Sequence, residues 1–272
     1  MKKLFRMSLL LVISALLLAA CGGDKEEESK ALSEDKVLVG VTGGPHEQIF
    51  EVVKEVAAKD GLDVELKVFS DYIMPNKALA EGQLDVNSYQ HKPFMDKFNE
   101  DHGTDLVAAV PTILSAIGVY SNEIDDIADV PENAKIGIPN DPSNGSRALV
   151  LFEKAGLIKL DDAKRDNATP LDVVENEKNV SFVELDAAQL PLMLDEVNLA
   201  VINGNFAASH GLNPSTDSIY TESIDSPYVN YIVVRKENEN DAVIEKLRKA
   251  YHSDEVKQFI EEEFKGSYLP KW

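Results

Sequence analysis

The feature that most constrains the fold is the alternation of short β-branched runs with helical segments. Residues 37–41 form an apolar run, the next apolar residues recur at helical spacing until 60–61, and a second β-branched run follows at 64–69. A strand, a helix and a strand in this order predict a parallel unit. After the polar stretch 121–133 the same alternation restarts. We therefore expect an α/β protein with two lobes, each built on an open parallel sheet.

The remaining expected elements follow the same alternation. The first series continues with a helix at 75–81, a strand at 84–87, a helix at 93–99 and strands at 106–110 and 113–120. The second series has a strand at 135–139, a helix at 143–155, a strand at 180–185, a helix at 187–194 and a strand at 199–203. A strand at 228–234 and helices at 241–251 and 254–264 close the chain. Ligands of open α/β sheets bind at the carboxyl ends of the strands, so a cleft between the lobes is the expected site.

The N-terminus predicts export and anchoring. Basic residues at 2, 3 and 6 precede the apolar run 7–20, which is typical of a secretory signal. A helix of this run would be about 21 Å long at 1.5 Å per residue, too short for the roughly 30 Å core of a bilayer. The run ends in Leu-Ala-Ala-Cys-Gly at 18–22, which resembles the bacterial lipoprotein box. We expect cleavage before Cys21 and acylation of Cys21, with an unlipidated signal peptide as the alternative.

Charge and cysteine content exclude several classes of function. The net charge is −21 and the isoelectric point is about 4.6, so a nucleic-acid partner is not expected. Cys21 is the only cysteine, which excludes an internal disulfide, a cysteine-rich zinc site and an iron–sulfur cluster. Residues 21–35 are small and charged, and they predict an acidic tether that follows the signal segment 1–20.

No motif supports an enzyme or a cofactor. The glycine-containing turn at 40–44 lacks the spacing of a dinucleotide fingerprint, and the Ser-x-x-Lys match at 33–36 lies at the edge of the tether. A surface hydrolase would need a nucleophile that the sequence does not offer. The histidines show no ligand spacing, but folding could gather them, so a zinc-binding surface receptor remains an alternative. They are His46, His91, His102, His210 and His252.

Three polar and aromatic clusters fall at the expected strand ends, at 69–76, 87–94 and 139–147. In the third cluster, Arg147 lies near the N-terminus of a helix. A guanidinium beside free helix amides is suited to a carboxylate, because it makes two parallel hydrogen bonds. The alternative is a helix arginine paired with Asp141, and the residues alone leave both open.

These clusters, with segments farther along the chain, closely resemble the methionine-binding lipoproteins of the NlpA/MetQ family. The resemblance covers nearly the whole chain after the signal segment. The segments that carry it are 71–72 with 75–76 (Asp-Tyr, Pro-Asn), 89–93 (Tyr-Gln-His-Lys-Pro), 139–142 (Pro-Asn-Asp-Pro), 171–176 (Leu-Asp-Val-Val-Glu-Asn), 201–203 (Val-Ile-Asn), 226–230 (Ser-Pro-Tyr-Val-Asn) and 271–272 (Lys-Trp).

The resemblance implies a free amino acid as ligand and a set of contact residues. Arg147 would hold the α-carboxylate, and two asparagine amides would accept from the α-ammonium. Three aromatic rings would enclose the thioether, and His91 would donate to the ligand or to a neighbour. A histidine satisfied within the protein is the alternative for His91. The implied contacts are Tyr72, Tyr89, His91, Phe94, Arg147, Asn203 and Asn230.

The resemblance also implies a type II periplasmic-binding-protein fold, with two lobes and two interlobe crossings, that delivers methionine to an ABC permease and its ATPase. The expected protein is a monomeric, membrane-anchored lipoprotein without a cofactor or catalytic activity, and it takes L-methionine, with D-methionine as a further candidate. Tyr89, residues 145–146 and residues 204–206 depart from the family pattern, so a methionine-containing dipeptide or another amino acid is the alternative ligand. The expected division is lobe 1 at 36–119 and 231–272, lobe 2 at 120–230, and crossings near 118–122 and 228–232.

Overall fold

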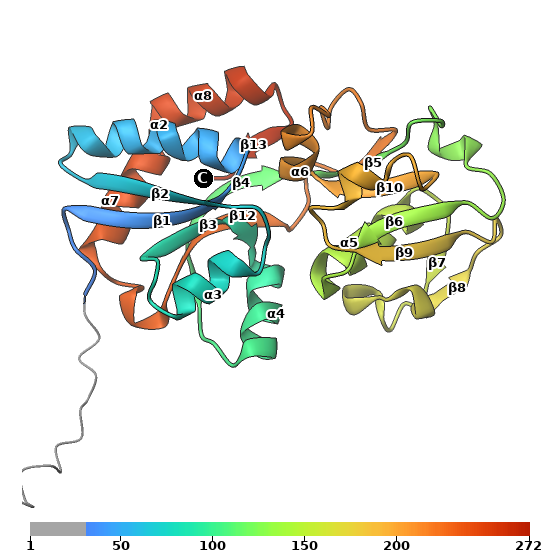
Figure 1. Cartoon of the computed structure of the whole chain (residues 1–272), viewed down its shortest axis with the longest axis horizontal. Coiled ribbons are helices and arrows are strands. Elements are labelled where there is room, and N and C mark those ends of the chain that lie inside the picture. The colour runs from blue at the N-terminus through green and yellow to red at the C-terminus, as the bar shows by residue number, and fades with distance from the viewer. Residues whose placement is uncertain (1–30) are drawn as a thin grey trace, which may run out of the picture. The chain divides into compact units, whose positions relative to one another are not determined.

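Two β-sheets organise the part of the chain that the computed structural model describes, residues 31–272 (Figure 1). The expected signal segment, Cys21 and tether residues 21–30 lie outside the described residues. Residues 32–272 form one unit that contains both sheets and the helices that flank them. Each sheet with its helices makes one lobe, so the expected two-lobe α/β architecture is confirmed.

The first sheet has six strands in the order β13-β4-β12-β3-β1-β2. Strand β1 pairs in parallel with β2 and β3, whereas β12 is antiparallel to both β3 and β4, and β13 is antiparallel to β4. The sheet is therefore mixed and not parallel throughout, because the returning chain inserts β12 in the opposite direction. The strands are β1 Lys36–Thr42, β2 Asp63–Phe69, β3 Val86–His91, β4 Val107–Ser115, β12 Val229–Val234 and β13 Tyr268–Pro270.

Helices cover both faces of this sheet (Figure 1). Helices α2 (Pro45–Lys59), α7 (Ala242–Tyr251) and α8 (Asp254–Phe264) enclose one apolar core with β1, β4 and β12. Helices α3 (Met74–Ala80) and α4 (Lys92–His102) enclose a second core on the opposite face. A short 3₁₀ turn, η5 (Lys236–Asn238), leads from β12 to α7.

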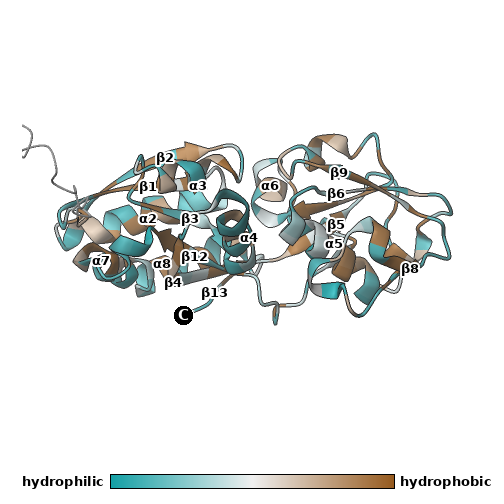
Figure 2. Ribbon diagram, turned by 90° about the horizontal axis from the view of Figure 1, so that it is seen from below, coloured by the Kyte–Doolittle hydropathy of each residue, from teal (hydrophilic) through white to brown (hydrophobic). Residues whose placement is uncertain are grey.

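The second sheet has five strands in the order β11-β5-β10-β6-β9. Strand β6 is parallel to β9 and β10, and β5 is antiparallel to β10 and β11, so this sheet is also mixed. Figure 2 shows β6 and β9 mostly in the hydrophobic colour; after its first residue β6 is buried on both faces, whereas β9 at the edge of the sheet is only partly buried. The strands are β5 Ile117–Tyr120, β6 Lys135–Pro139, β9 Ser181–Leu185, β10 Leu199–Asn203 and β11 Tyr220–Thr221.

Helix α5 (Pro142–Lys154) and helix α6 (Gly204–Ser209) flank the second sheet. The side chains of α5 pack with β6 and β10 in one core, and α6 packs with η4 in another. The small hairpin of β7 (Lys159–Leu160) and β8 (Val173–Glu175) lies after α5. The 3₁₀ turns of this lobe are η1 Ile127–Asp129, η2 Arg165–Asn167, η3 Pro170–Asp172 and η4 Leu190–Met193.

The chain passes twice between the sheets. It leaves the first sheet after Ser115 and enters the second at Ile117, and it returns through residues 222–228 between β11 and β12. The sequence pattern placed these crossings a few residues later, near 118–122 and 228–232. The passage from β4 to β5 at Ala116 lies within an apolar stretch and has no glycine or proline beside it. Local sequence signals therefore do not mark this crossing. The lobe boundaries at 119/120 and 230/231 stay a proposal.

One expected element differs in kind and another in extent. The helix expected at 187–194 is replaced by η4, because Pro191 lacks the amide that a continuous helix needs at its centre. The strand expected at 84–87 is β3, which runs on through the polar residues 87–91 with all its side chains buried. Strand β4 also passes through Pro111, where its register with β12 is interrupted.

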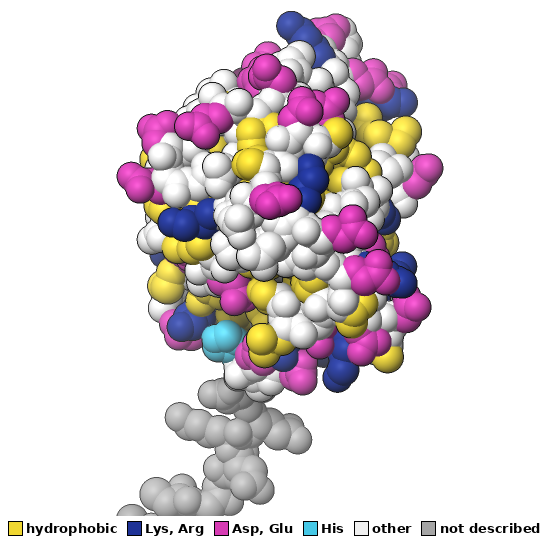
Figure 3. All heavy atoms as spheres, turned by 90° about the vertical axis from the view of Figure 1, so that its right-hand side faces the viewer, with side chains coloured by type: hydrophobic (Ala, Val, Ile, Leu, Met, Phe, Trp, Pro, Cys, Tyr) yellow, Lys and Arg dark blue, Asp and Glu magenta, His cyan; other side chains and the backbone are white. Residues whose placement is uncertain are grey.

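Surface and helix lengths add two facts about the described residues. On the face drawn in Figure 3, acidic and basic side chains are interspersed and basic side chains do not gather in one area. Among residues 31–272, no helix is long and apolar enough to cross a membrane.

Candidate functional site

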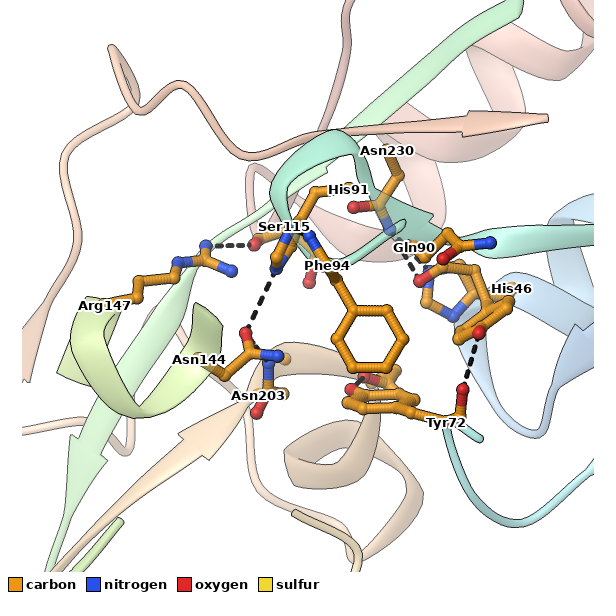
Figure 4. A pocket seen from close by; sticks show the side chains of 13 residues that line it. His46, Tyr72, Gln90, His91, Phe94, Ser115, Asn144, Arg147, Asn203 and Asn230 are labelled. Carbon is orange, nitrogen blue, oxygen red and sulfur yellow. Dashed lines mark hydrogen bonds between the residues drawn. The ribbon is translucent and has the colours of Figure 1, made fainter. Parts of the chain in front are cut away.

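A cavity between the two sheets brings together all seven residues singled out from the sequence (Figure 4). The space among these residues, counted with its opening to solvent, is about 340 Å³. Both lobes contribute, because residues from α2, β3, α4 and β12 face residues from α5, β10 and α6. The lining residues are His46, Tyr72, Tyr89, Gln90, His91, Phe94, Ser115, Asn144, Arg147, Asn203, Gly204, Asn205 and Asn230.

The polar end of β3 forms one wall of the cavity and is held by its own side chains. Asn76 from α3 accepts from Asn87 at 2.8 Å and from Gln90 at 2.5 Å. Gln90 also donates to the carbonyl oxygen of the Asn87 side chain at 2.9 Å. These amides are buried and satisfy one another, so a strand of polar residues is stable in the interior.

His91 ends β3 and begins α4, and its hydrogen bonds define its tautomer. Nδ1 accepts from the backbone amide of Phe94 at 3.2 Å, so the proton is on Nε2, which donates to Asn144 Oδ1 at 3.1 Å. Burial, with Arg147 nearby, lowers the pKa of His91 to about 3. The ring is therefore neutral and both nitrogens are bound within the protein, so of the two alternatives His91 donates to a neighbour.

Asn203 presents an acceptor to the cavity. Its Nδ2 donates to Asn144 Oδ1 at 3.0 Å, which fixes the amide with Oδ1 on the opposite side. Among the described residues, no group donates to Asn203 Oδ1, although the atom is buried. An unpaired acceptor in the interior is costly, so this oxygen is suited to a donor on a ligand.

Asn230 presents a second acceptor from the other lobe. Its Nδ2 contacts Tyr89 O at 3.1 Å and His46 Nε2 at 3.0 Å, so Oδ1 is the atom available to a ligand (Figure 4). Burial lowers the pKa of His46 to about 4, so Nε2 accepts and Nδ1 donates to Thr42 Oγ1 at 2.8 Å. The neutral histidine thereby sets the orientation of the asparagine.

Arg147 is buried and paired, but not with Asp141. Its Nε donates to Glu222 Oε1 at 3.0 Å, and its Nη2 donates to Glu222 Oε2 and to Ser115 O. Asp141 instead caps α5, where it accepts from the amide of Asn144 at 2.9 Å. The pairing of Arg147 with Asp141, which the sequence left open, is therefore wrong, and the partner is Glu222. The two parallel bonds of the guanidinium go to Glu222, which leaves Nη1 toward the cavity.

Aromatic rings enclose the other end of the cavity. Tyr72 lies 5.7 Å from both Tyr89 and Phe94 between ring centroids, and 4.8 Å from Phe206 of the opposite lobe. The hydroxyls are bound within the protein: Tyr72 donates to Asn205 Oδ1 and Tyr89 donates to Tyr72 O, both at 2.5 Å. Ring carbon atoms are thus available to an apolar ligand group.

Sequence reasoning missed several lining residues and one partner. Asn144 stood inside a cluster that was singled out for Arg147, and Asn205 stood in a segment noted as a departure, so both carried a signal. His46 was named only as a candidate zinc ligand, and Ser115 and Glu222 carried no signal. Their roles depend on contacts between distant segments. The Tyr228 ring centroid lies 4.3 Å from Arg147 Cζ, a contact that its place in the 226–230 segment does not predict.

Histidines of the described residues do not assemble a metal site. No group of three or more histidine, cysteine or acidic side chains in residues 31–272 is placed to hold an ion. His46 and His91 are bound to asparagines, and His102 stacks on Phe98 at 4.1 Å between centroids. His252 stacks on Trp272 at 4.9 Å. The geometry does not favour the zinc-receptor alternative.

The two buried histidines predict a pH dependence of stability. Their pKa values are lowered from 6.5, so below pH 6.5 these side chains bind protons in the unfolded chain but not in the folded one. The contribution of the two histidines to the free energy of unfolding should be complete above pH 6.5. It should fall by a few kcal/mol as the pH drops through the range from 6.5 toward 4 and 3. Urea denaturation at a series of pH values measures it.

The control for this pH dependence is the double variant His46→Gln with His91→Gln. Its stability should depend less on pH between 6.5 and 4 than that of the wild type, because acidic groups titrate alike in both. Equal slopes would contradict the assignment.

Comparison with known proteins gives one family. Residues 37–272 match the model described as NlpA lipoprotein. The D-methionine-binding lipoproteins MetQ of Salmonella typhi and of Escherichia coli K12 are each 42% identical over 264 residues, which cover 96% of this chain and 95% of theirs.

Solved structures agree with the sequence match. A nutrient binding protein from Burkholderia cenocepacia bound to methionine is 45% identical, with a TM-score of 0.85, over 87% of this chain and 100% of that one. A structure of the methionine binding protein MetQ is 43% identical, with a TM-score of 0.86, over 88% and 99%.

Proposed function

This chain belongs to the NlpA lipoprotein family, and on that premise we propose that it is the substrate-binding lipoprotein of an ABC importer and binds methionine. The family is one of substrate-binding proteins with the type II periplasmic-binding-protein fold. The observation that carries the proposal is the pairing of opposite chemistries in one cavity. A guanidinium nitrogen and two asparagine oxygens lie at its polar end, and aromatic rings lie at the other.

Each part of a methionine zwitterion has a partner in this cavity. The α-carboxylate accepts from Arg147 Nη1, and the α-ammonium donates to Oδ1 of Asn203 and Oδ1 of Asn230. The thioether packs among Tyr72, Tyr89 and Phe94, where sulfur gains both burial and contact with the rings. The chain binds and releases the amino acid unchanged, so no catalytic role is proposed.

Calorimetry and native mass spectrometry test this function. The full chain is titrated with L-methionine, D-methionine, glycyl-methionine, leucine and zinc, before and after unfolding and refolding to remove retained ligand. Binding of methionine with leucine at least ten times weaker supports the proposal. Binding of the dipeptide alone would replace methionine by a peptide, and zinc binding alone would contradict the importer function.

Binding is proposed to close the two lobes, the first sheet with its helices against the second sheet with its helices. Asn205 supports this, because it bonds the first lobe from the second: it accepts from Tyr72 at 2.5 Å and donates to Thr42 Oγ1 at 3.4 Å. Ser209 Oγ adds a contact with Gly43 O at 3.4 Å. Opening of the lobes would break these bonds, so we expect them to slow opening and ligand release.

Replacing Asn205 with alanine should therefore increase the dissociation rate of methionine about tenfold, while the association rate changes little. Stopped-flow fluorescence measures both rates. Asn176→Ala is the matched control, because that side-chain amide bonds only Val180 within its own lobe. An unchanged dissociation rate in Asn205→Ala would remove the residue from the closure contacts.

The location and partners follow from the proposed lipid anchor. Cys21 lies outside the described residues, and its acylation is proposed from the lipoprotein box and from relatives that are named lipoproteins. The chain would be held at the extracytoplasmic face of the cell membrane as a monomer. There it would pass methionine to its permease, which an ATPase powers.

A further inference from the structure

Glu222 lies behind the cavity and not in its lining. It belongs to the returning crossing, just after β11, and only 7% of its side chain is exposed. Its Oε1 and Oε2 take the Nε and Nη2 hydrogens of Arg147, whose own side chain is 3% exposed. A buried charge pair of this kind cancels most of the field that either ion would place on its surroundings.

Both crossings fix the guanidinium. Ser115 O, at the end of the first crossing strand, accepts from Nη2 at 3.0 Å, and the Tyr228 ring of the second lies 4.3 Å from Cζ. Among residues 31–272, no group accepts a hydrogen bond from Nη1. The ligand carboxylate therefore meets one nitrogen of an arginine whose charge is already balanced.

The lining together with Glu222, which pairs with Arg147 from outside it, carries no net charge. Of the thirteen lining residues in the described chain, Arg147 alone is ionised, since burial keeps His46 and His91 neutral and Tyr72 and Tyr89 protonated. Glu222 balances Arg147. The charge of Asp141 raises the pKa of both tyrosines. This carboxylate accepts hydrogen bonds from the backbone amide and the side-chain amide of Asn144 at the N-terminus of α5. The acceptors opposite Arg147 are neutral amide oxygens.

We propose that Glu222 sets the net charge of the ligand that this site accepts and restricts it to zwitterions. The inference rests on the proposed function. A zwitterion adds a carboxylate and an ammonium and leaves the buried total at zero. An analogue with one of these groups buries one uncompensated charge, which costs free energy in an interior of low dielectric. Glu222 touches no ligand and acts through Arg147 as a positioning residue.

The test compares three ligands with the same side chain: methionine, its deaminated acid 4-(methylsulfanyl)butanoate, and methioninamide. In the wild-type full chain, both analogues should bind at least tenfold more weakly than methionine. In Glu222→Gln the site gains one positive charge, so the ratio of the Kd of the deaminated acid to that of methionine should fall about tenfold or more. The ratio for methioninamide should rise.

Two variants separate this charge effect from a loss of structure. Glu222→Asp keeps the charge and should keep the wild-type ratio even if all affinities fall. Glu175→Gln removes one charge from the exposed pair with Lys159 in the same lobe and should change no ratio. If Glu222 only supports the fold, all three affinities fall by one factor in Glu222→Gln and the proposal is overturned.

The remaining outcomes are also decisive. If Glu222→Gln does not fold, Glu222→Asp and the wild-type series carry the test, and a wild type that binds the deaminated acid as well as methionine overturns the proposal. A wild type that binds no methionine refutes the proposed function itself. A wild type that binds methionine with unchanged ratios in Glu222→Gln refutes only the role of Glu222.

Discussion

Replacing Arg147 with methionine should weaken methionine binding by at least about a hundredfold, because the ligand carboxylate then has no cation in a buried site. The variant should also lose about 3 kcal/mol of folding free energy or more, since Glu222 becomes a buried charge without a partner. Calorimetric titration and urea denaturation measure the two effects separately. Loss of binding alone would not distinguish the ligand role from damage to the fold.

The double variant Arg147→Met with Glu222→Gln makes this distinction. Without either charge the interior is neutral again, so stability should return toward the wild type while binding stays lost. Arg165→Met is the matched control, because Arg165 is a half-exposed cation of the same lobe paired with Glu153. A double variant that binds methionine as tightly as the wild type would show that Arg147 does not hold the carboxylate.

Replacing Asn203 with leucine should lower methionine affinity roughly 10- to 100-fold, because the ammonium loses one of its two acceptors. The free energy of unfolding of the variant should rise or stay unchanged. Asn203 Oδ1 is buried without a donor among the described residues, and leucine of similar size removes that cost. Asn144 Oδ1 keeps its bond from His91 Nε2 at 3.1 Å.

A matched variant and one clear outcome accompany this prediction. Asn122→Leu makes the same exchange at an exposed position of the same lobe, where the amide bonds Asp195, and should leave affinity unchanged. Thermal unfolding without ligand should show Asn203→Leu at or above the wild-type midpoint. Unaltered methionine affinity in Asn203→Leu would mean that the ammonium lies elsewhere.

The alternation of apolar runs predicts most of the architecture because strand and helix periods are local properties of the chain. Strand β6 begins and ends at the predicted residues, and α8 does too. The same local signals fail where tertiary contacts decide. β3 is polar by composition and is a buried strand only because Asn76, Asn87 and Gln90 satisfy one another. Sheet direction also escapes local signals, since β12 takes its place from the path of the whole chain.

The cavity shows the same division. The resemblance to a family predicted seven ligand-contact residues, and in the structure all seven line one cavity. What could not be read is how they are held. The bond from His46 to Asn230 joins the first helix to β12, and Arg147 to Glu222 joins α5 to a crossing. Neither pair has a spacing in sequence that a local rule recognises.

The position of β12 has a consequence for the order of assembly during folding. Val234 pairs with Val86 on one side and with Val107 on the other, so the first sheet stays divided until the last quarter of the chain is in place. The strands of the second sheet all lie between Ile117 and Thr221 and need no such return. Slow, long-range pairing should therefore limit the folding rate of the first lobe, while the second lobe can fold independently of the C-terminal segment. If the chain is exported unfolded, as the proposed lipoprotein would be, its first lobe can be completed only after nearly all of it has crossed the membrane.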